Sequence, residues 1–379
     1  MDGKQIKLPM IDDHQTAVCC LGEQAAATFE DAAGANWVTG QLETVVGPIY
    51  QVSTALDHQD RTGSAKARWG IGRMNYAIPP ALYAIGEPDK TSPVLVSANY
   101  KLSFDLLRRE LTGLNLWVLV IDTKGINVWC AAGKGSFGTA ELVRMVVCTR
   151  LSELVSDHTL ILPQLAAPGV SAHEVRRHCG FKIVYGPVRA ADIPAFLSAG
   201  CKAEASMRQT HFTLRDRLIL APVELVGMIK PLIGLTAFLF LLNLVAMLFG
   251  RNLVSLNFLV GQTLFDLIPF LIAILVGVIL VPALLPYIPG RALAWKGWVL
   301  GIFWALGYSL LTVSNTGWLQ SAAYFLIIPA ITAFIGMNFT GSTTYTSLSG
   351  VIKEMGIALP LIIVSASLGL IALITAYFV

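Results

Sequence analysis

Charged residues almost disappear from the chain after Lys230. Residues 231–379 contain four basic and two acidic side chains, whereas residues 1–230 contain 23 Lys or Arg and 22 Asp or Glu. A segment this long with six charges cannot form a water-facing surface. The sequence therefore predicts a water-soluble N-terminal half and a C-terminal half that is embedded in a membrane.

The C-terminal half contains apolar runs separated by polar or Gly- and Pro-containing stretches. A helix needs about 20 apolar residues to cross a bilayer, where its backbone groups must be satisfied internally. Five runs meet or approach this length: residues 231–249, 264–285, 298–314, 320–337 and 356–378. We expect residues 231–379 to form an all-α transmembrane bundle of about five helices.

Basic residues between the apolar runs predict the orientation of the bundle. Arg291, Lys296 and Lys353 fall in loops on the side of the soluble half, and Arg251 falls in the first loop on the other side. Basic loops stay on the cytoplasmic side, and no secretory signal opens the chain. We expect a multi-pass protein of the inner (cytoplasmic) membrane with a cytoplasmic soluble half. Asp266 is expected to meet water at the membrane interface, although an intramembrane carboxylate is also a functional candidate.

The soluble half alternates short apolar runs with amphipathic stretches. Strands alternating with helices, such as a helix from about Thr139 to Leu154, indicate crossover connections and a parallel sheet. Four runs indicate buried strands: residues 93–98, 114–121, 159–162 and 181–185. We predict a Rossmann-like, mostly parallel α/β domain, whose ligands would bind beyond the carboxyl ends of its strands.

Changes in composition predict four segments. Residues 1–36 should be partly irregular, 37–205 the α/β domain, 206–230 a juxtamembrane linker, and 231–379 the transmembrane domain. The soluble half is near neutral and lacks the clustered basic excess of a nucleic-acid-binding protein, so no nucleic-acid partner is expected. The six cysteines show no spacing typical of a disulfide framework.

A short helix is predicted in the loop after the strongest strand, which ends at Ile121. Asn127 is a good N-cap, and Gly133 could end the helix in a left-handed conformation. Cys130 would lie near the middle of this helix, where the small side chains of Ala131 and Ala132 would let a flat ligand approach the backbone. A thiolate there is a strong donor that suits a late first-row metal.

Two other functions were considered for this loop. The phosphate-binding P-loop pattern fails at Val128 and Gly135, and the G-x-G-x-x-G pattern that starts at Gly133 begins eleven residues after the strand rather than directly after it. Cys130 could also be a catalytic nucleophile, but no histidine forms a recognisable partner motif with it.

The sequence Asn127-Val-Trp-Cys-Ala-Ala-Gly-Lys134 resembles the cap-helix motif N-(V/I)-W-C-A-(A/G)-G-K of the mercury-methylation corrinoid protein family, HgcA. It also resembles, less closely, the corrinoid domain of the acetyl-CoA pathway's corrinoid iron–sulfur protein. Residues 68–86, the loop 338–350, and the order of a corrinoid domain followed by about five spans look like the first family. No cysteine cluster here could hold a 4Fe–4S centre, which takes four thiolates.

The resemblance implies methyl transfer from methyl-Co(III) cobalamin to Hg(II), giving methylmercury, with Cys130 as the lower axial ligand of cobalt. It implies cobalamin or a related corrinoid as cofactor, an HgcB-like ferredoxin with two 4Fe–4S clusters as electron donor, and an upstream methyl donor protein. Other cofactor contacts are expected in the approach loop, along the cap helix and after later strands: Thr123, Gly125, Asn127, Val128, Trp129, Ala131, Ala132, Gly133, Lys134, Gln164, Gly169, Gly186 and Pro187. Trp129 is expected mainly to pack under the helix.

Two alternative functions are also compatible with the sequence. One is a membrane-bound corrinoid methyl carrier in one-carbon metabolism of the acetyl-CoA pathway type. The other is a membrane protein with a regulatory nucleotide-binding domain.

Overall fold

The computed structural model describes residues 32–249, 255–312, 317–339 and 348–378. These residues form two compact units. One unit extends to Thr210 but omits Arg68–Gly70, and the other combines Arg68–Gly70 with the chain from His211 onward. We call the first the α/β unit and the second the helical unit.

The α/β unit is built on a seven-stranded sheet with the strand order β1-β2-β3-β5-β4-β6-β7. Four of these strands form a parallel set, as predicted: β4 (Val94–Ala98), β5 (Leu116–Ile121), β6 (Thr159–Leu162) and β7 (Lys182–Tyr185). Every residue of β4 and β5 is buried, because helices cover both faces of the sheet. The predicted α/β class is therefore confirmed.

Three N-terminal strands make the sheet mixed, which the sequence did not predict. β1 (Val38–Thr44) and β2 (Gly47–Val52) form an antiparallel hairpin, and β3 (Leu82–Ile85) runs antiparallel to β5. Exposed and half-buried residues alternate along β1, as expected for an edge strand with one face toward water. Because β1 contains few apolar residues, it does not form the continuous apolar run by which the other strands were predicted.

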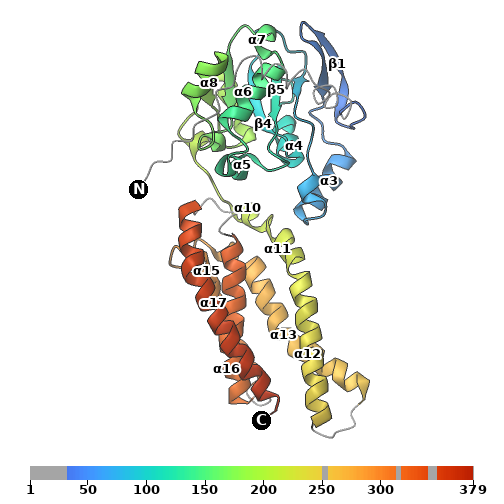
Figure 1. Ribbon diagram of the computed structural model, residues 1–379, viewed down its shortest axis with the longest axis vertical. Coiled ribbons are helices and arrows are strands. Elements are labelled where there is room, and N and C mark those ends of the chain that lie inside the picture. Colours follow the sequence, from blue (N-terminus) through green and yellow to red (C-terminus); the bar gives the residue numbers. More distant parts are fainter. Residues whose placement is uncertain (1–31, 250–254, 313–316, 340–347, 379) are drawn as a thin grey trace. The chain divides into compact units, whose positions relative to one another are not determined.

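Helices on the two faces of the sheet bury two separate cores (Figure 1). Alternate residues of β5 serve the two sides, since successive side chains of a strand point to opposite faces. One core contains residues of α6 (Thr139–Cys148), α7 (Leu151–Leu154) and α8 (Ala172–Cys179), and the other contains residues of α4 (Lys101–Arg109) and α9 (Ile193–Ser198). The helix predicted from Thr139 to Leu154 is two helices, because Arg150 adopts a left-handed conformation with φ of 50°.

A buried ion-pair network ties α3 (His58–Arg68) to α4. Lys101 Nζ lies 2.6 Å from Asp60 Oδ1 and 2.8 Å from Asp105 Oδ1, and Arg108 reaches the same two carboxylates at 2.6 and 2.8 Å. Two cations and two anions balance each other, so every charge of this network has a partner of opposite sign. Burial alone would raise the pKa of Asp60, but the hydrogen bonds from Lys101 and Arg108 lower it to about 2.

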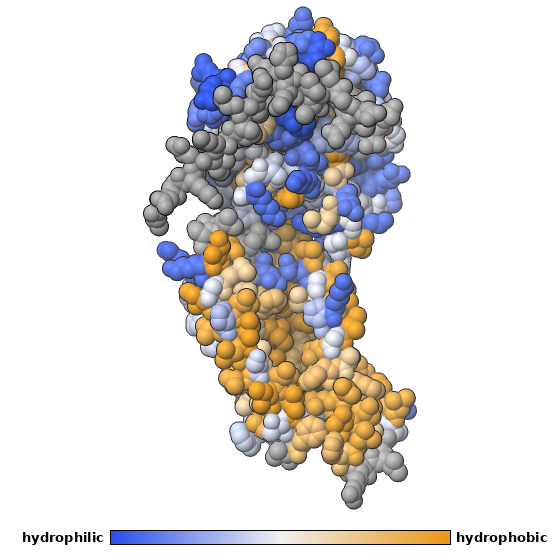
Figure 2. Space-filling view, in the orientation of Figure 1, coloured by the Kyte–Doolittle hydropathy of each residue, from blue (hydrophilic) through white to orange (hydrophobic). Residues whose placement is uncertain are grey.

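The helical unit is a bundle with an apolar surface, which appears orange in Figure 2. Two short helices, α10 (Leu214–Leu218) and α11 (Ala221–Gly227), precede the long ones. The long helices are α12 (Ile229–Phe249), α13 (Leu256–Leu275) with its continuation η5 (Val276–Leu280) and α14 (Val281–Leu284), α15 (Leu293–Thr312), α16 (Trp318–Asn338) and α17 (Leu348–Ala376). Among the described residues, four helices are long and apolar enough to cross a membrane.

The helix α15 is not among these four, although its segment was predicted to span. It begins at Leu293 rather than at residue 298 and so includes Lys296, which is buried and donates a hydrogen bond to the carbonyl of Leu285. Lys296 is therefore not in a loop, contrary to expectation, and neither is Lys353, which lies in α17. Gly297 and Gly301 face α16 so closely that a Cβ on either would meet Thr332 within 2.2 Å. Small residues at this spacing let two helix backbones pack together inside a bundle.

Asp266 lies inside the helical unit rather than at a water interface. Its side chain is 3% exposed and accepts hydrogen bonds from Asn243 of α12, Gln262 of α13 and Tyr377, at 2.8, 3.0 and 2.5 Å. The expectation of a water-facing position is wrong, because α12 and the C-terminal segment cover this part of α13. Most of the loop 338–350, which resembles the mercury-methylation corrinoid protein family in sequence, lies outside the described residues.

Candidate functional site

The parallel strands place a topological switch point between β4 and β6. In the order β5-β4-β6-β7, the strand that follows β4 in the chain, β5, lies on one side of β4. The next strand, β6, lies on the other side of β4. Loops that diverge in this way leave a crevice at the carboxyl ends of the strands, where open α/β sheets bind ligands. The loops after β4, β5 and β6 therefore define the region in which a site is expected.

The predicted helix after β5 is present as α5 (Val128–Lys134), which is just under two turns long. Asn127 is its N-cap, and its side-chain oxygen accepts a hydrogen bond from the backbone N–H of Cys130 at 2.9 Å. The left-handed residue that ends the helix is Gly135, with φ of 83°, and not Gly133, which lies inside the helix. The helix runs two residues further than predicted because glycine can continue a turn when its neighbours are good helix formers.

The two faces of α5 differ in exposure. Ala131 and Ala132 are buried in the core beneath the helix. Gly133 and Lys134 are exposed, and Cys130 is half-buried. The outer face of α5, with the Cys130 thiol at its edge, is the surface on which a ligand can lie.

Trp129 is half-buried and is not part of the core, in contrast to the expectation that it packs under the helix. Val128 and Ile126 fill that role instead, since both pack against the core cluster. Helical spacing explains why Val128 rather than Trp129 packs against the core. Val128 lies three and four residues before the buried Ala131 and Ala132 and therefore on the same side of α5. Trp129 is thereby available at the edge of the outer face.

The segment after β6 packs against α5. The helix packs against η2 (Gln164–Ala166) and β4. A Cβ at Gly169 would lie 2.2 Å from the carbonyl oxygen of Phe137 and 3.0 Å from Cα of Ala132, so only glycine fits there. Gly169 was predicted to contact a cofactor, but the structure uses it to let two backbone segments meet.

The loop between β5 and α5 is held from within. Thr123 is fully buried, and its hydroxyl donates to the carbonyl of Ile126 at 2.7 Å. Gly125 is also buried, and its φ of 67° explains the glycine. Both residues were predicted to contact a cofactor, yet their polar groups already have partners in the protein. They shape the loop that leads to α5.

The remaining predicted contacts follow β6 and β7. Gln164 is half-buried and accepts a hydrogen bond from Arg208 at 2.6 Å. Gly186 and Pro187 are buried, and a Cβ at Gly186 would lie 3.2 Å from Ile161. Of these three, Gln164 alone keeps a partly exposed polar group near the carboxyl ends of the strands.

Cys130, Cys179 and Cys201 are free thiols. Burial raises the pKa of the Cys179 and Cys201 thiols, which makes them poorer metal donors at neutral pH. Within the described residues, no group of three or more His, Cys, Asp or Glu side chains could hold a metal ion.

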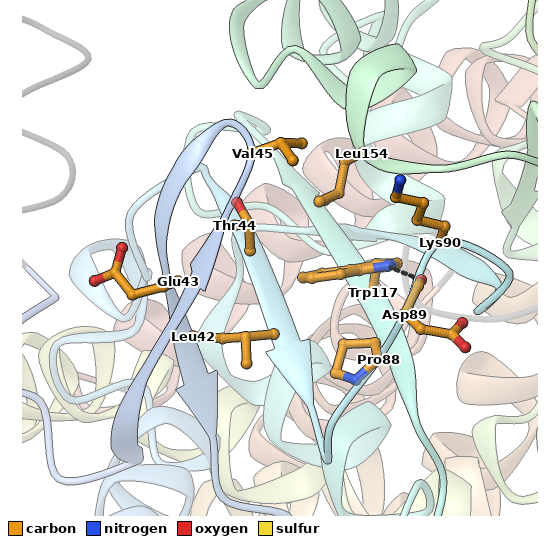
Figure 3. Close-up of a pocket in the computed structure, with 9 residues that line it drawn as sticks. All are labelled: Leu42, Glu43, Thr44, Val45, Pro88, Asp89, Lys90, Trp117 and Leu154. Carbon is orange, nitrogen blue, oxygen red and sulfur yellow. Dashed lines mark hydrogen bonds between the residues drawn. The ribbon is translucent and has the colours of Figure 1, made fainter.

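A pocket of about 510 Å³ lies at the opposite, amino ends of the strands (Figure 3). Trp117, near the start of β5, forms its floor, and the indole N–H of Trp117 donates to the carbonyl of Asp89 at 3.0 Å. The other lining residues are Leu42, Glu43, Thr44, Val45, Pro88, Lys90 and Leu154. None of the predicted site residues lies in this pocket, which is open to solvent and separate from α5.

Comparison with known proteins finds relatives of the α/β unit. The family described as CO dehydrogenase/acetyl-CoA synthase delta subunit matches residues 73–197, which include α5. Subunit gamma of the acetyl-CoA decarbonylase/synthase complex of Methanopyrus kandleri is 33% identical over 123 residues, and that of Archaeoglobus fulgidus 29% over 127 residues. Subunit gamma 2 from Methanosarcina thermophila is 31% identical over 129 residues.

These matches cover about a third of this chain (32–33%) and about a quarter of the relatives (26–27%). The chain thus spans about a quarter of the length of the curated relatives it matches. The matched region contains the four parallel strands and the helix that carries Cys130. Residues 73–197 are therefore related to a domain of subunits of the acetyl-CoA decarbonylase/synthase complex.

Proposed function

We propose that the α/β unit binds a corrinoid and transfers methyl groups, with Cys130 as the lower axial ligand of cobalt, and that the apolar helices anchor it in a membrane. The observation that carries this proposal is the position of the free Cys130 thiol at the edge of the outer face of α5. The relation of residues 73–197 to the acetyl-CoA decarbonylase/synthase subunits and the resemblance of Asn127–Lys134 to a corrinoid cap helix support it.

The residues present fit a corrinoid. A corrin ring is flat and fills four positions around its cobalt, so the protein need supply only one further donor. Cys130 is such a donor, and its sulfur is soft enough for a late first-row metal. The inner face of α5 packs against η2 and β4, which leaves the outer face as the platform for a flat group.

The chain's own residues have three tasks in this proposal. Asn127 fixes the start of α5 and thereby the direction of the Cys130 side chain. The exposed Lys134 and the half-buried Trp129 can contact the rim of a flat ligand. When bound, the corrinoid supplies a cobalt atom that carries the methyl group, while the protein supplies orientation and electronic tuning. A thiolate donates electron density to the metal and so favours transfer of the methyl group with its bonding electrons.

Two methyl-transfer functions are consistent with this site, and they differ in the molecule that receives the methyl group. The comparisons favour a methyl carrier in one-carbon metabolism, because the relatives are subunits of an acetyl-CoA decarbonylase/synthase complex. The cap-helix motif and the thiol ligand favour Hg(II), an electrophile that must receive the methyl group as a carbanion equivalent. In that case an HgcB-like ferredoxin would supply low-potential electrons and a separate protein the methyl group.

The nucleotide-binding alternative has no support from the geometry. Gly135 ends α5, and a Cβ at Gly138 would lie 2.7 Å from the carbonyl oxygen of Gly135. These glycines therefore allow a tight turn between two helices. The pattern that they form in the sequence follows from packing and needs no phosphate group to explain it.

A single-turnover experiment tests the proposal and separates the two acceptors. The full chain in detergent is loaded with cobalamin that carries a labelled methyl group and is then mixed with Hg(II). Labelled methylmercury that forms with the wild type and not with Cys130→Ala supports the mercury acceptor. Label that stays on the protein despite excess Hg(II) supports the carrier function. Failure of the wild type to retain cobalamin would remove both.

A further inference from the structure

Asn99, which follows β4 directly, is the most highly connected buried polar side chain near α5. It is 6% exposed. Its side-chain oxygen accepts three hydrogen bonds: from the backbone N–H of Thr123 at 3.0 Å, from the hydroxyl of Thr123 at 2.9 Å and from the backbone N–H of Gly125 at 3.0 Å. Its amide nitrogen donates to Asp122 Oδ1 at 3.2 Å. One side chain on β4 thus holds the loop that follows β5.

The backbone of this loop is shaped to receive an oxygen atom. Lys124 and Gly125 both adopt left-handed conformations, with φ of 58° and 67°. The N–H groups of Thr123 and Gly125 both donate to Asn99 Oδ1, while the N–H of Lys124 between them donates to Asp122 Oδ1. The oxygen of Asn99 thus satisfies two backbone donors of the turn. Without it, buried N–H groups would lack partners, which is costly.

The contacts continue from this loop to the cobalt ligand proposed above. The single hydroxyl proton of Thr123 lies between two acceptors, Asn99 Oδ1 at 2.9 Å and the carbonyl oxygen of Ile126 at 2.7 Å, and is shared by them. The next residue, Asn127, caps α5 by accepting from the backbone N–H of Cys130. Hydrogen bonds therefore hold the chain at Thr123–Ile126 from the end of β4, and the adjoining residue Asn127 holds the backbone of Cys130.

We propose that Asn99 is a positioning residue that fixes the Cys130 sulfur for coordination of cobalt. This inference rests on the proposed function, because it assigns Asn99 a role at the same site. The proposed effect of Asn99 acts through the loop before α5, because its side chain bonds to Asp122, Thr123 and Gly125. It replaces a flexible connection between β5 and α5 with one that is anchored to the centre of the sheet, so that the direction of the thiol is set before the corrinoid binds.

The test measures corrinoid retention and the visible absorption spectrum of the full chain in detergent, loaded with hydroxocobalamin. Asn99→Ala should weaken corrinoid binding by roughly tenfold, comparable to the loss of one or two net hydrogen bonds. It should also shift the spectrum toward that of Cys130→Ala. The matched control is Asn115→Ala, at the amino end of β5, where the side chain accepts one hydrogen bond from the N–H of Glu87 at 2.9 Å. This control should keep the wild-type spectrum.

A second pair of variants covers the case in which Asn99→Ala does not fold. Asn99→Asp keeps the three accepted hydrogen bonds but places two carboxylates opposite each other, whereas Asn99→Asp combined with Asp122→Asn restores a donor between the two positions. The double variant should recover part of the wild-type spectrum that the single variant loses. A structural role alone would change thermal stability in these variants but leave the spectrum of the folded, loaded protein unchanged.

The possible outcomes are distinguishable. If the wild type retains corrinoid with a Cys130-dependent spectrum and the Asn99 variants do the same, the inference about Asn99 is wrong and the proposed function stands. If the wild type retains no corrinoid, the proposed function fails and the role of Asn99 fails with it. Spectra that change in the Asn99 variants but not in Asn115→Ala support the inference.

Discussion

Asn127 Oδ1 accepts a hydrogen bond from the backbone N–H of Cys130 at 2.9 Å. The N-cap of α5 is therefore bonded directly to the residue that carries the proposed cobalt ligand. This contact explains why an asparagine three residues before a cysteine is a meaningful spacing, since an N-cap side chain reaches the N–H groups of the first turn. The direction of the Cys130 side chain depends on how firmly this first turn is held.

Removal of the N-cap should loosen α5. We expect Asn127→Ala to cost about 1 kcal/mol of local stability and to speed amide hydrogen exchange within residues 128–134 roughly fivefold. Asn127→Ser, which keeps an oxygen that can accept the bond, should exchange nearly as slowly as the wild type. Equal exchange rates in all three proteins would show that the cap does not hold the helix.

Gly169 should not tolerate a side chain. A Cβ there would overlap the carbonyl oxygen of Phe137, so Gly169→Ala should lower the free energy of unfolding of the α/β unit by about 1–3 kcal/mol. Gly133→Ala is the matched control, because a Cβ at this exposed helical position meets nothing within 4 Å. It should be neutral or stabilising by roughly 0.5–1 kcal/mol. Denaturant unfolding of the two variants would contradict this packing if their stabilities were equal.

The buried ion-pair network predicts acid sensitivity. The pKa of Asp60 is about 2 in the folded chain, below its ordinary value of 3.8, because its bonds to Lys101 and Arg108 outweigh the effect of burial. A lowered pKa contributes stability that is present above pH 4 and is lost as the pH falls toward 2. Asp60→Asn should be less stable at neutral pH and should lose less on acidification over this range. Parallel stability curves for the two proteins would rule out this contribution.

Asp266 should stabilise the helical unit. Asp266→Ala would leave the donors of Asn243, Gln262 and Tyr377 without their acceptor inside the bundle, at a cost of about 1–3 kcal/mol. Asp266→Asn keeps one acceptor oxygen and should cost less. Unfolding of the full chain in mixed detergent micelles measures both. If Gln262→Ala lowered the free energy of unfolding as much as Asp266→Ala, the Asp266 carboxylate would not be the group that holds Asn243, Gln262 and Tyr377 together.

The parallel part of the fold could be predicted because its strands are continuous apolar runs. The residues predicted for β6 are the residues observed, and β4, β5 and β7 differ from prediction by one or two residues. The N-terminal strands could not be found in this way. β1 alternates polar with apolar residues, and the direction of β3 depends on tertiary pairing with β5 rather than on its own sequence.

The candidate site was predicted in part for a similar reason. The N-cap and the position of Cys130 follow from local helix rules, and α5 obeys them. The burial of Ala131, Ala132 and Thr123 depends on which side of the helix and loop meets the sheet, which local rules do not determine. Asn99 was missed because the sequence places it 23 or more residues from the loop that it holds.

The same limit explains the corrections in the helical unit. Hydropathy located the apolar segments, but it treats each residue as if it faced lipid or water alone. Lys296 and Asp266 are instead accommodated by partners on other segments, the carbonyl of Leu285 and the side chain of Asn243. Charged groups inside a bundle are stabilised by such contacts, which only the folded arrangement of helices reveals.

The most direct test of the central claim is the visible absorption spectrum of the full chain in detergent, loaded with cobalamin, in the wild type and in Cys130→Ala. Cys179→Ala is the control, because Cys179 is another half-buried free thiol of the same unit. We predict that the wild type and Cys179→Ala share one spectrum and that Cys130→Ala shows another, since only Cys130 supplies sulfur to cobalt. Identical spectra in all three proteins would contradict the assignment of Cys130 as the axial ligand.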